Sequence, residues 1–182
     1  MGKVEIEVKV AVSNLESVKQ MLIRMGGELI KKVKQVDIYF THPCRDFAIT
    51  DEALRLRLEE DSATLTYKGP KIGLVGKSRI EIGVRVSNSK ALIDILKALG
   101  FKPVFNVVKL REVYVLKNRY KVSLDDVEDL GFFVEVELIG SYERVREAET
   151  ELLNLLKSLG IESPRPIRKS YLELLLAKKG LI

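Results

Sequence analysis

The chain has 182 residues and a mass of 20.6 kDa, which is the size of one ordinary domain. Its composition is that of a globular protein, with 46% apolar residues, 31% charged residues and a formal net charge of +5. A single cysteine, Cys44, excludes an internal disulfide, and a single histidine, His42, excludes most histidine-based metal sites. Any bound metal must therefore be held by carboxylates, which suits Mg²⁺ or Mn²⁺ better than structural Zn²⁺.

The sequence also argues against membrane and nucleic-acid partners. No apolar run approaches the roughly 20 residues that a membrane-spanning helix needs. The N-terminal segment alternates apolar with charged residues and lacks the apolar core of a signal peptide, so we expect a cytoplasmic protein. The excess positive charge is spread along the chain without interleaved aromatic residues, which argues against binding to RNA or DNA.

A strand followed by a helix recurs three times along the chain. Apolar and charged residues alternate in the three predicted strands, 4–10, 79–86 and 132–139. The first helix is predicted to start at a capping box formed by Ser13 and Glu16, and the second at Asn88. Each helix is predicted to stop at a glycine: Gly26, Gly100 and Gly160.

Further strands fill the intervals between these units. They are predicted at 36–40, 54–59, 64–68, 105–116 and 119–124. Together with the repeat strands they make eight, and the segment after Pro166 predicts one more short helix. No low-complexity linker divides the chain, so we expect a single α+β domain over residues 1–182.

Nearly every predicted strand has one apolar side and one charged side, because residues i and i+2 of a strand share a face. Glu5, Glu7 and Lys9, for example, lie opposite Val4, Ile6 and Val8. The charged side can simply meet water, as antiparallel sheets allow. Alternatively, the sheet closes into an eight-stranded antiparallel β-barrel, a tunnel with a charged lumen that is covered outside by the helices.

Two features favour the barrel. Glu5 with Glu7 and Glu135 with Glu137 each place two carboxylates one pleat apart, at roughly 7 Å between Cα atoms. Such crowding is unfavourable unless a divalent cation lies among the oxygens. The basic positions are rich in arginine, whose planar fork suits phosphate oxygens: Arg55, Arg57, Arg79 and Arg111. Acidic pairs for a metal and arginines for phosphate describe a site for a metal-bound polyphosphate.

In this order, the motifs resemble the CYTH superfamily, also called triphosphate tunnel metalloenzymes, which includes class IV adenylyl cyclases, thiamine triphosphatases and tripolyphosphatases. The matching elements are the Glu-x-Glu-x-Lys signature at Glu5, Glu7 and Lys9; the segment 35–57; Thr66 and Lys68; Ser78, Arg79 and Glu81; Lys109 and Arg111; Asp125; the pair Glu135 and Glu137; and the closing KSYLELL segment. The resemblance covers nearly the whole chain.

The resemblance implies a role for each of these positions. The metal ligands would be Glu5, Glu7, Glu81, Asp125, Glu135 and Glu137. The triphosphate would be held by Lys9, Arg55, Arg57, Lys68, Arg79, Lys109 and Arg111, with Arg168 or Lys169 closing the site. The catalytic residues would be Lys9, Tyr39, Lys68 and Arg111, and Tyr39 has packing as an alternative role.

The resemblance implies a Mg²⁺- or Mn²⁺-dependent enzyme that acts on ATP, thiamine triphosphate or tripolyphosphate. In a cyclase the ribose 3′-hydroxyl attacks the α-phosphorus of ATP and pyrophosphate leaves, whereas in a triphosphatase water attacks the terminal phosphorus. Class IV cyclases typically carry a His-Phe pair ahead of the N-terminal signature, and this sequence has none, so both reactions remain open. The alternative is a non-catalytic protein that binds polyphosphate or nucleotide. Homodimers are common among similar proteins.

Three other features are read as structural. The segment GLVGKS at 73–78 lacks the first glycine of a P-loop, since Lys71 stands at that position, and it predicts a hairpin loop between strands. His42 is predicted to be a loop residue and Cys44 a structural thiol, because neither has the partners that a nucleophilic site requires.

Overall fold

The computed structural model describes residues 3–71, 79–141 and 144–182, and within these ranges it forms eight strands and four helices. The strands are β1 (Lys3–Val12), β2 (Glu28–Thr41), β3 (Ala53–Leu58), β4 (Ala63–Lys68), β5 (Glu81–Val86), β6 (Lys102–Leu116), β7 (Tyr120–Val127) and β8 (Gly131–Ser141). The helices are α1 (Glu16–Arg24), α2 (Ser89–Ala98), α3 (Val145–Ser158) and α4 (Tyr171–Lys178). The predicted loop at 73–78, which includes Lys77 and Ser78, lies outside the described residues.

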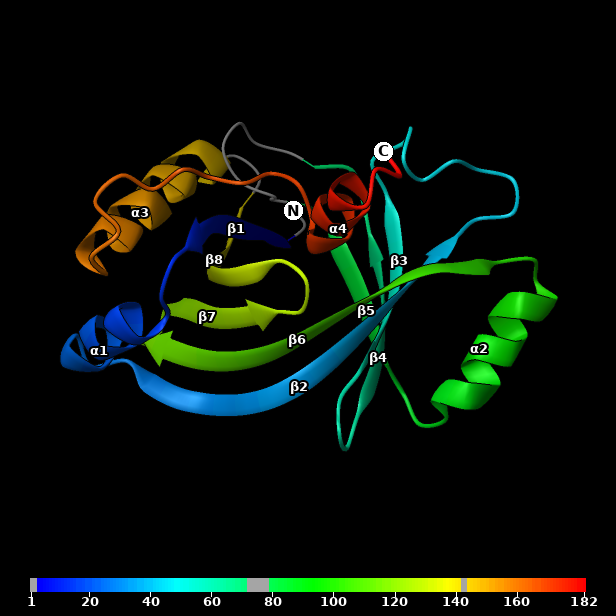
Figure 1. Cartoon of the computed structure of the whole chain (residues 1–182), viewed down its shortest axis with the longest axis horizontal. Coiled ribbons are helices and arrows are strands. Elements are labelled where there is room, and N and C mark those ends of the chain that lie inside the picture. Colours follow the sequence, from blue (N-terminus) through cyan, green and yellow to red (C-terminus); the bar gives the residue numbers. More distant parts are fainter. Residues whose placement is uncertain (1–2, 72–78, 142–143) are drawn as a thin grey trace.

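All eight strands join one antiparallel sheet in the order β1-β8-β7-β6-β2-β3-β4-β5. The long strands β2 and β6 run through both halves of the molecule, with β1, β8 and β7 beside one half and β3, β4 and β5 beside the other (Figure 1). The sheet is strongly curled into a half-barrel, and its two edges meet where the backbone N–H of Arg79 donates to the carbonyl of Glu5 at 3.3 Å. The predicted eight-stranded antiparallel tunnel fold is confirmed in this form.

The apolar side of β1, β8, β7 and β6 packs against α1 and α3. Ile6 and Val8 of β1 are fully buried there, together with Leu22 of α1 and Leu152 and Leu156 of α3. Burying each such side chain contributes about 1.5–3 kcal/mol, so this contact forces the opposite, charged side of the same strands toward the inside of the curl.

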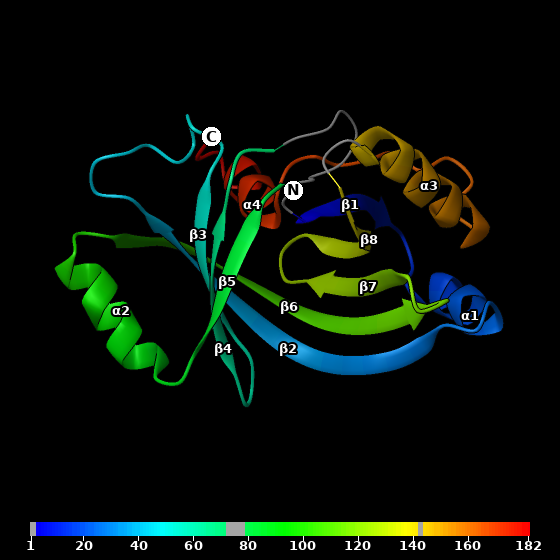
Figure 2. The same ribbon diagram turned by 180° about the vertical axis from the view of Figure 1, so that it is seen from behind.

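The other half of the sheet is covered only in part. Leu96 of α2 packs on Phe40, Leu56 and Ala63, which belong to β2, β3 and β4. Figure 2 shows β5 beyond this contact, at the edge of the sheet. The apolar side chains on and just before β5 are therefore more than half exposed: Ile80 at 52%, Ile82 at 65% and Val84 at 59%. Along most of this strand, the helices do not cover the outside of the sheet.

The predicted strand–helix repeat is confirmed. Each of the three units ends at a glycine with positive φ, 85° at Gly26, 91° at Gly100 and 89° at Gly160. This left-handed conformation is strained for other residues, which is why glycine stops each helix.

Two local predictions are wrong. Helix α1 has no capping box at Ser13 and Glu16; instead the backbone N–H of Glu16 donates to Oδ1 of Asn14 at 2.6 Å. Strand β2 begins at Glu28 and not near residue 36. Its first half is rich in lysine and hides the alternation, but it pairs with β6 from Glu28 onward, so the partner strand sets its length.

Helix α4 lies on the concave side of the sheet, between its two halves (Figure 1). It begins with a capping box, in which Ser170 and Glu173 each accept a hydrogen bond from the other residue's backbone N–H. Its first residue, Tyr171, is buried among Tyr39, Val107, Val127 and Phe133. Of the helices that the structure describes, none is long and apolar enough to cross a membrane.

Candidate triphosphate and metal site

A cavity of about 970 Å³ lies inside the curl of the sheet, and every one of the eight strands contributes to its lining. The charged residues that line it along the sheet are Glu5, Glu7, Asp37, Arg55, Arg57, Lys68, Arg79, Glu81, Lys109, Arg111, Lys121, Glu135 and Glu137. Charges of both signs therefore share one cavity, which is the arrangement that the barrel hypothesis requires and that a flat, solvated sheet face does not produce.

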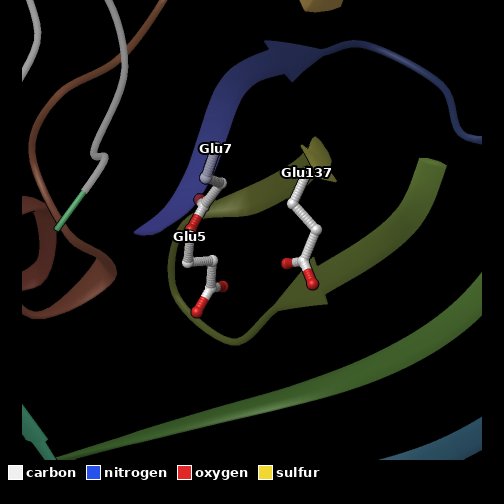
Figure 3. Close-up of side chains that lie close together, drawn as sticks. All are labelled: Glu5, Glu7 and Glu137. Carbon is white, nitrogen blue, oxygen red and sulfur yellow. The ribbon is translucent and has the colours of Figure 1, made fainter. Parts of the chain in front are cut away.

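Three carboxylates form a compact cluster in this cavity. Glu5 and Glu7 come from β1 and Glu137 from β8, where Glu7 and Glu137 are directly paired across the strands. Each residue offers one oxygen within 4.8 Å of the other two, and Figure 3 shows the Glu5 and Glu137 side chains extending to the same side of the two strands. Burial and the nearby negative charges of Glu137 and Glu81 raise the pKa of Glu5 to about 7.

This cluster fits a hard divalent cation. The ligand atoms are all carboxylate oxygens, which Mg²⁺ and Mn²⁺ prefer, and a cation among them would remove the repulsion that raises the pKa of Glu5. The remaining predicted metal ligands lie elsewhere in the network. Glu81 pairs with Lys68, and Asp125 and Glu135 pair with Arg111.

Arg111 is held by two acidic residues and, through them, by α4. Its Nε lies 2.6 Å from Oδ1 of Asp125, and its Nη2 also donates to Asp125 and Glu135. The hydroxyl of Tyr171 donates to Oδ2 of Asp125 at 2.7 Å. Burial works against the charged guanidinium, but Asp125 and Glu135 outweigh it and raise the pKa of Arg111 well above its usual value. Asp125 itself is fully buried and does not line the cavity.

A second cationic group surrounds Asp37, which the sequence analysis did not select. Arg57 donates to both of its carboxylate oxygens, Lys109 lies 3.1 Å from Oδ2, and Nη1 of Arg55 lies 3.9 Å from Oδ2. Burial would raise the pKa of Asp37, but the three positive charges lower it well below its usual range. The signal was present, because Asp37 shares a strand face with Tyr39, which was selected.

Two lysines of the cavity, Lys68 and Lys109, have lowered pKa values. Burial and the neighbouring Arg55 lower the pKa of Lys68 to about 8, although Lys68 pairs with Glu81. Burial and Arg57 lower the pKa of Lys109 to about 7. An anion bound beside these two lysines would raise the pKa of both and so favour their protonated forms.

Lys9 lies beneath the start of α4 and is not among the residues that line the cavity. Its Nζ donates to the backbone carbonyl of Lys169 at 2.6 Å and lies 4.0 Å from the ring centre of Tyr171. The side chains of Arg168 and Lys169 are exposed, and neither lines the cavity. The C-terminal segment thus lines the cavity from Ser170 onward, while the Lys169 backbone holds Lys9.

Two other predicted site residues line the cavity. Tyr39 is 7% exposed and packs in the same cluster as Tyr171. Arg79 is also 7% exposed, and its Nη2 lies 3.9 Å from Asp51. The loop residues His42 and Cys44 line the outer part of the cavity, as part of the connection between β2 and β3.

The chain is similar to known proteins over most of its length. The sequence model of the CYTH domain family matches residues 3–171. A protein of Methanocaldococcus jannaschii named "Putative adenylate cyclase" is 43% identical over 175 residues, which cover 94% of this chain and 98% of that protein.

Solved structures show the same architecture. A protein of Pyrococcus horikoshii is 39% identical, with a TM-score of 0.88 over 96% of this chain and 99% of that one. A protein of Hippeastrum, named a "Putative adenylyl cyclase" and described as having a dominant triphosphatase activity, shares the fold with a TM-score of 0.67 at 16% identity, over 100% of this chain and 97% of that one.

Proposed function

Because the chain belongs to the CYTH domain family, we propose that it is a divalent-metal-dependent enzyme that acts on a triphosphate inside the curled sheet. Its reaction is either the class IV adenylyl cyclase reaction, from ATP to cyclic AMP and pyrophosphate, or the hydrolysis of an organic or inorganic triphosphate. One observation carries the proposal: the Glu5, Glu7 and Glu137 cluster and the buried cations line a single cavity.

The acidic cluster would hold Mg²⁺ or Mn²⁺. When bound, the ion supplies positive charge that offsets the negative charge of the triphosphate and of the pentavalent transition state. Glu5 and Glu137 supply oxygens from two neighbouring strands, and the main-chain pairing of β1 with β8 fixes their separation.

The cations would bind the phosphate oxygens. Arg55, Lys68, Lys109 and Arg111 are already placed by acidic partners on neighbouring strands, so little reorganisation is needed when an anion arrives. Arg57 and Arg79 also line the cavity, and Lys9, which lies outside its lining, stays a proposed contributor. Tyr39 and either Arg168 or Lys169 stay as proposed contributors to leaving-group positioning and closure.

The reaction depends on which oxygen is in line with the scissile bond. If the ribose 3′-hydroxyl of ATP lies opposite the pyrophosphate, the same positive field promotes cyclisation; if water lies opposite the terminal phosphate, it promotes hydrolysis. The name of the Methanocaldococcus relative points to the first reaction and that of the Hippeastrum protein to the second.

The test uses purified protein with Mn²⁺ and measures the release of phosphate and pyrophosphate from ATP and from tripolyphosphate, with chromatography for cyclic AMP. We expect product from the wild type and a loss of at least about a hundredfold in the double variant Glu5→Gln, Glu7→Gln. The control is Glu147→Gln, because Glu147 is exposed on α3 and should leave the rate unchanged.

The alternative, a non-catalytic binder, makes a different prediction in the same experiment. Such a protein binds ATP or tripolyphosphate in calorimetry but releases no product with Mn²⁺ or Mg²⁺. That result would replace the enzyme by a binding protein and would leave the site itself intact.

A further inference from the structure

The cavity has an outer part that differs from its charged interior. The outer part lies between the connection of β2 to β3 and α4. Its lining includes charged residues of these two segments, Arg45, Asp46, Asp51, Glu52 and Glu173. Beside them it has six apolar or aromatic side chains: His42, Phe47, Val104, Leu172, Leu176 and Ile182. We call these six residues the outer shelf. Leu172 and Leu176 are four residues apart on α4, so they present one face of that helix to the cavity.

The aromatic members of the shelf are held in place by contacts within the β2–β3 connection and with Phe101, which precedes β6. The ring of His42 lies 5.6 Å from that of Phe47 and 5.1 Å from that of Phe101, the second pair in an edge-to-face arrangement. The guanidinium of Arg45 lies 5.4 Å from the ring centre of Phe47, and its Nε pairs with Glu52 at 3.3 Å.

Hydrogen bonds fix the loop backbone as well. The N–H of Ala48 donates to Oδ1 of Asp46 at 2.8 Å, and the N–H of Thr50 donates to the Asp46 carbonyl at 3.1 Å. The hydroxyls of Thr50 and Tyr67 donate to Glu52. Phe47, the residue between these anchors, is half-buried and keeps part of its surface toward the cavity. The shelf therefore exists before a ligand arrives, which lowers the entropy cost of binding.

An inorganic triphosphate would gain no binding energy from the apolar side chains of the shelf. Its oxygens need charged and hydrogen-bonding groups, which the interior supplies, and a row of apolar side chains offers it none. A flat aromatic ring, in contrast, gains by stacking on Phe47 and by covering the leucines of α4. The cavity of about 970 Å³ is of the size that holds a whole cofactor-sized ligand.

We propose that the outer shelf binds the aromatic group of a triphosphate ester while the charged interior holds its phosphates, so that Phe47 determines the preference for aromatic triphosphates over inorganic tripolyphosphate. This inference rests on the proposed function, because it needs the phosphates to lie in the interior. It assigns a role to apolar side chains of the β2–β3 connection and of α4, which take no part in the proposed binding of phosphate or metal.

The test compares Phe47→Ala with Ile49→Ala. Ile49 is in the same loop and is 83% exposed, and it does not line the cavity, so it is a matched control. Binding of ATP, thiamine triphosphate and tripolyphosphate is measured by calorimetry with Mn²⁺, on the full chain, after thermal melting has shown that each variant folds.

For the wild type we expect at least one of the two aromatic triphosphates to bind more tightly than tripolyphosphate, although tripolyphosphate has the higher charge. Phe47→Ala should weaken that aromatic ligand by about tenfold or more and leave tripolyphosphate unchanged, since a stacking contact is lost. Phe47→Tyr should restore the affinity, because a tyrosine ring stacks equally well. Ile49→Ala should change neither the affinity for the aromatic ligand nor the affinity for tripolyphosphate.

The inference is overturned if wild-type protein binds tripolyphosphate at least as tightly as both esters, or if Phe47→Ala weakens all three ligands equally or none. These results would leave the proposed function standing, because phosphate binding persists in each. If the wild type binds none of the three ligands, the proposed function fails and the inference fails with it.

Discussion

Arg57 donates two hydrogen bonds to Asp37, from Nε to Oδ1 at 2.7 Å and from Nη2 to Oδ2 at 2.8 Å. The pair joins β2 to β3 at directly opposed positions of the ladder. Asp37 is only 1% exposed and is shared with Lys109 and Arg55, so one carboxylate keeps three cations together in the cavity. Without it, the three cations would lose their nearest counter-charge and would repel one another more strongly.

Replacing Asp37 should therefore destabilise the fold. We expect Asp37→Asn to lower the free energy of unfolding by about 3 kcal/mol, because it leaves buried cations without their anion. Urea unfolding measures this loss. Added tripolyphosphate should raise the melting temperature of the variant more than that of the wild type, since the ligand supplies the missing negative charge. The exposed Asp94 of α2 gives the control Asp94→Asn, and an equal loss there would refute the argument.

The acidic cluster should make metal binding depend on pH. The pKa of Glu5 is raised to about 7, so the carboxyl is mostly protonated below that pH and must lose its proton when a cation binds. We expect the Mn²⁺ affinity to rise as pH increases from about 6 to about 8 and then to level off. Calorimetry across this range tests the trend in the wild type and in Glu5→Gln, which should lose most of it. A flat wild-type profile would contradict the prediction.

Binding of the phosphates alone should take up protons. The pKa of Lys109 is lowered to about 7 and that of Lys68 to about 8, so both are partly neutral at pH 7.5. A bound polyanion favours their charged forms and raises both pKa values toward the usual range. Calorimetry with tripolyphosphate, EDTA and buffers of different ionisation enthalpy should show net proton uptake, and Lys109→Arg should reduce it. Net proton release would rule the prediction out.

The hydroxyl of Tyr171 should matter more than an ordinary buried hydroxyl. It donates to Asp125, which in turn holds Arg111, so its removal loosens a predicted catalytic residue. We expect Tyr171→Phe to cost about 1.5–3 kcal/mol of stability and to reduce kcat more than it changes KM. Tyr120→Phe is the matched control, because Tyr120 donates to Glu151 away from the cavity. Equal kcat values for the two variants would show that Tyr171 only packs.

Strand alternation predicted most of the sheet and the side of each strand that faces inward. Residues such as Glu7, Lys68 and Arg111 could be placed on that face because the period of two is a local property of the chain. The resemblance to a known family added which of them form one site, and the structure brings Glu5, Glu7 and Glu137 together as that grouping requires.

What the sequence did not reveal depends on partners far away in the chain. Strand β2 extends to Glu28 because β6 pairs with it there. This part of β2 is rich in lysine and lacks the alternation of apolar and polar residues from which a strand can be predicted. Asp125 resembled a metal ligand by its position, but its place between Arg111 and Tyr171 follows from where α4 docks. Ile82 is likewise exposed because α2 packs on β2, β3 and β4 and does not cover it. The sequence of β5 alone contains no sign of this.

Glu5 has two roles at once, because its backbone carbonyl joins the first strand to Arg79 while its side chain belongs to the acidic cluster. Among the described residues this is the bridge that closes the seam between the two edges of the sheet. An ion held by the Glu5 carboxylate would therefore also restrain the seam. Metal binding would then make the tunnel wall more rigid at the same time as it fills the site.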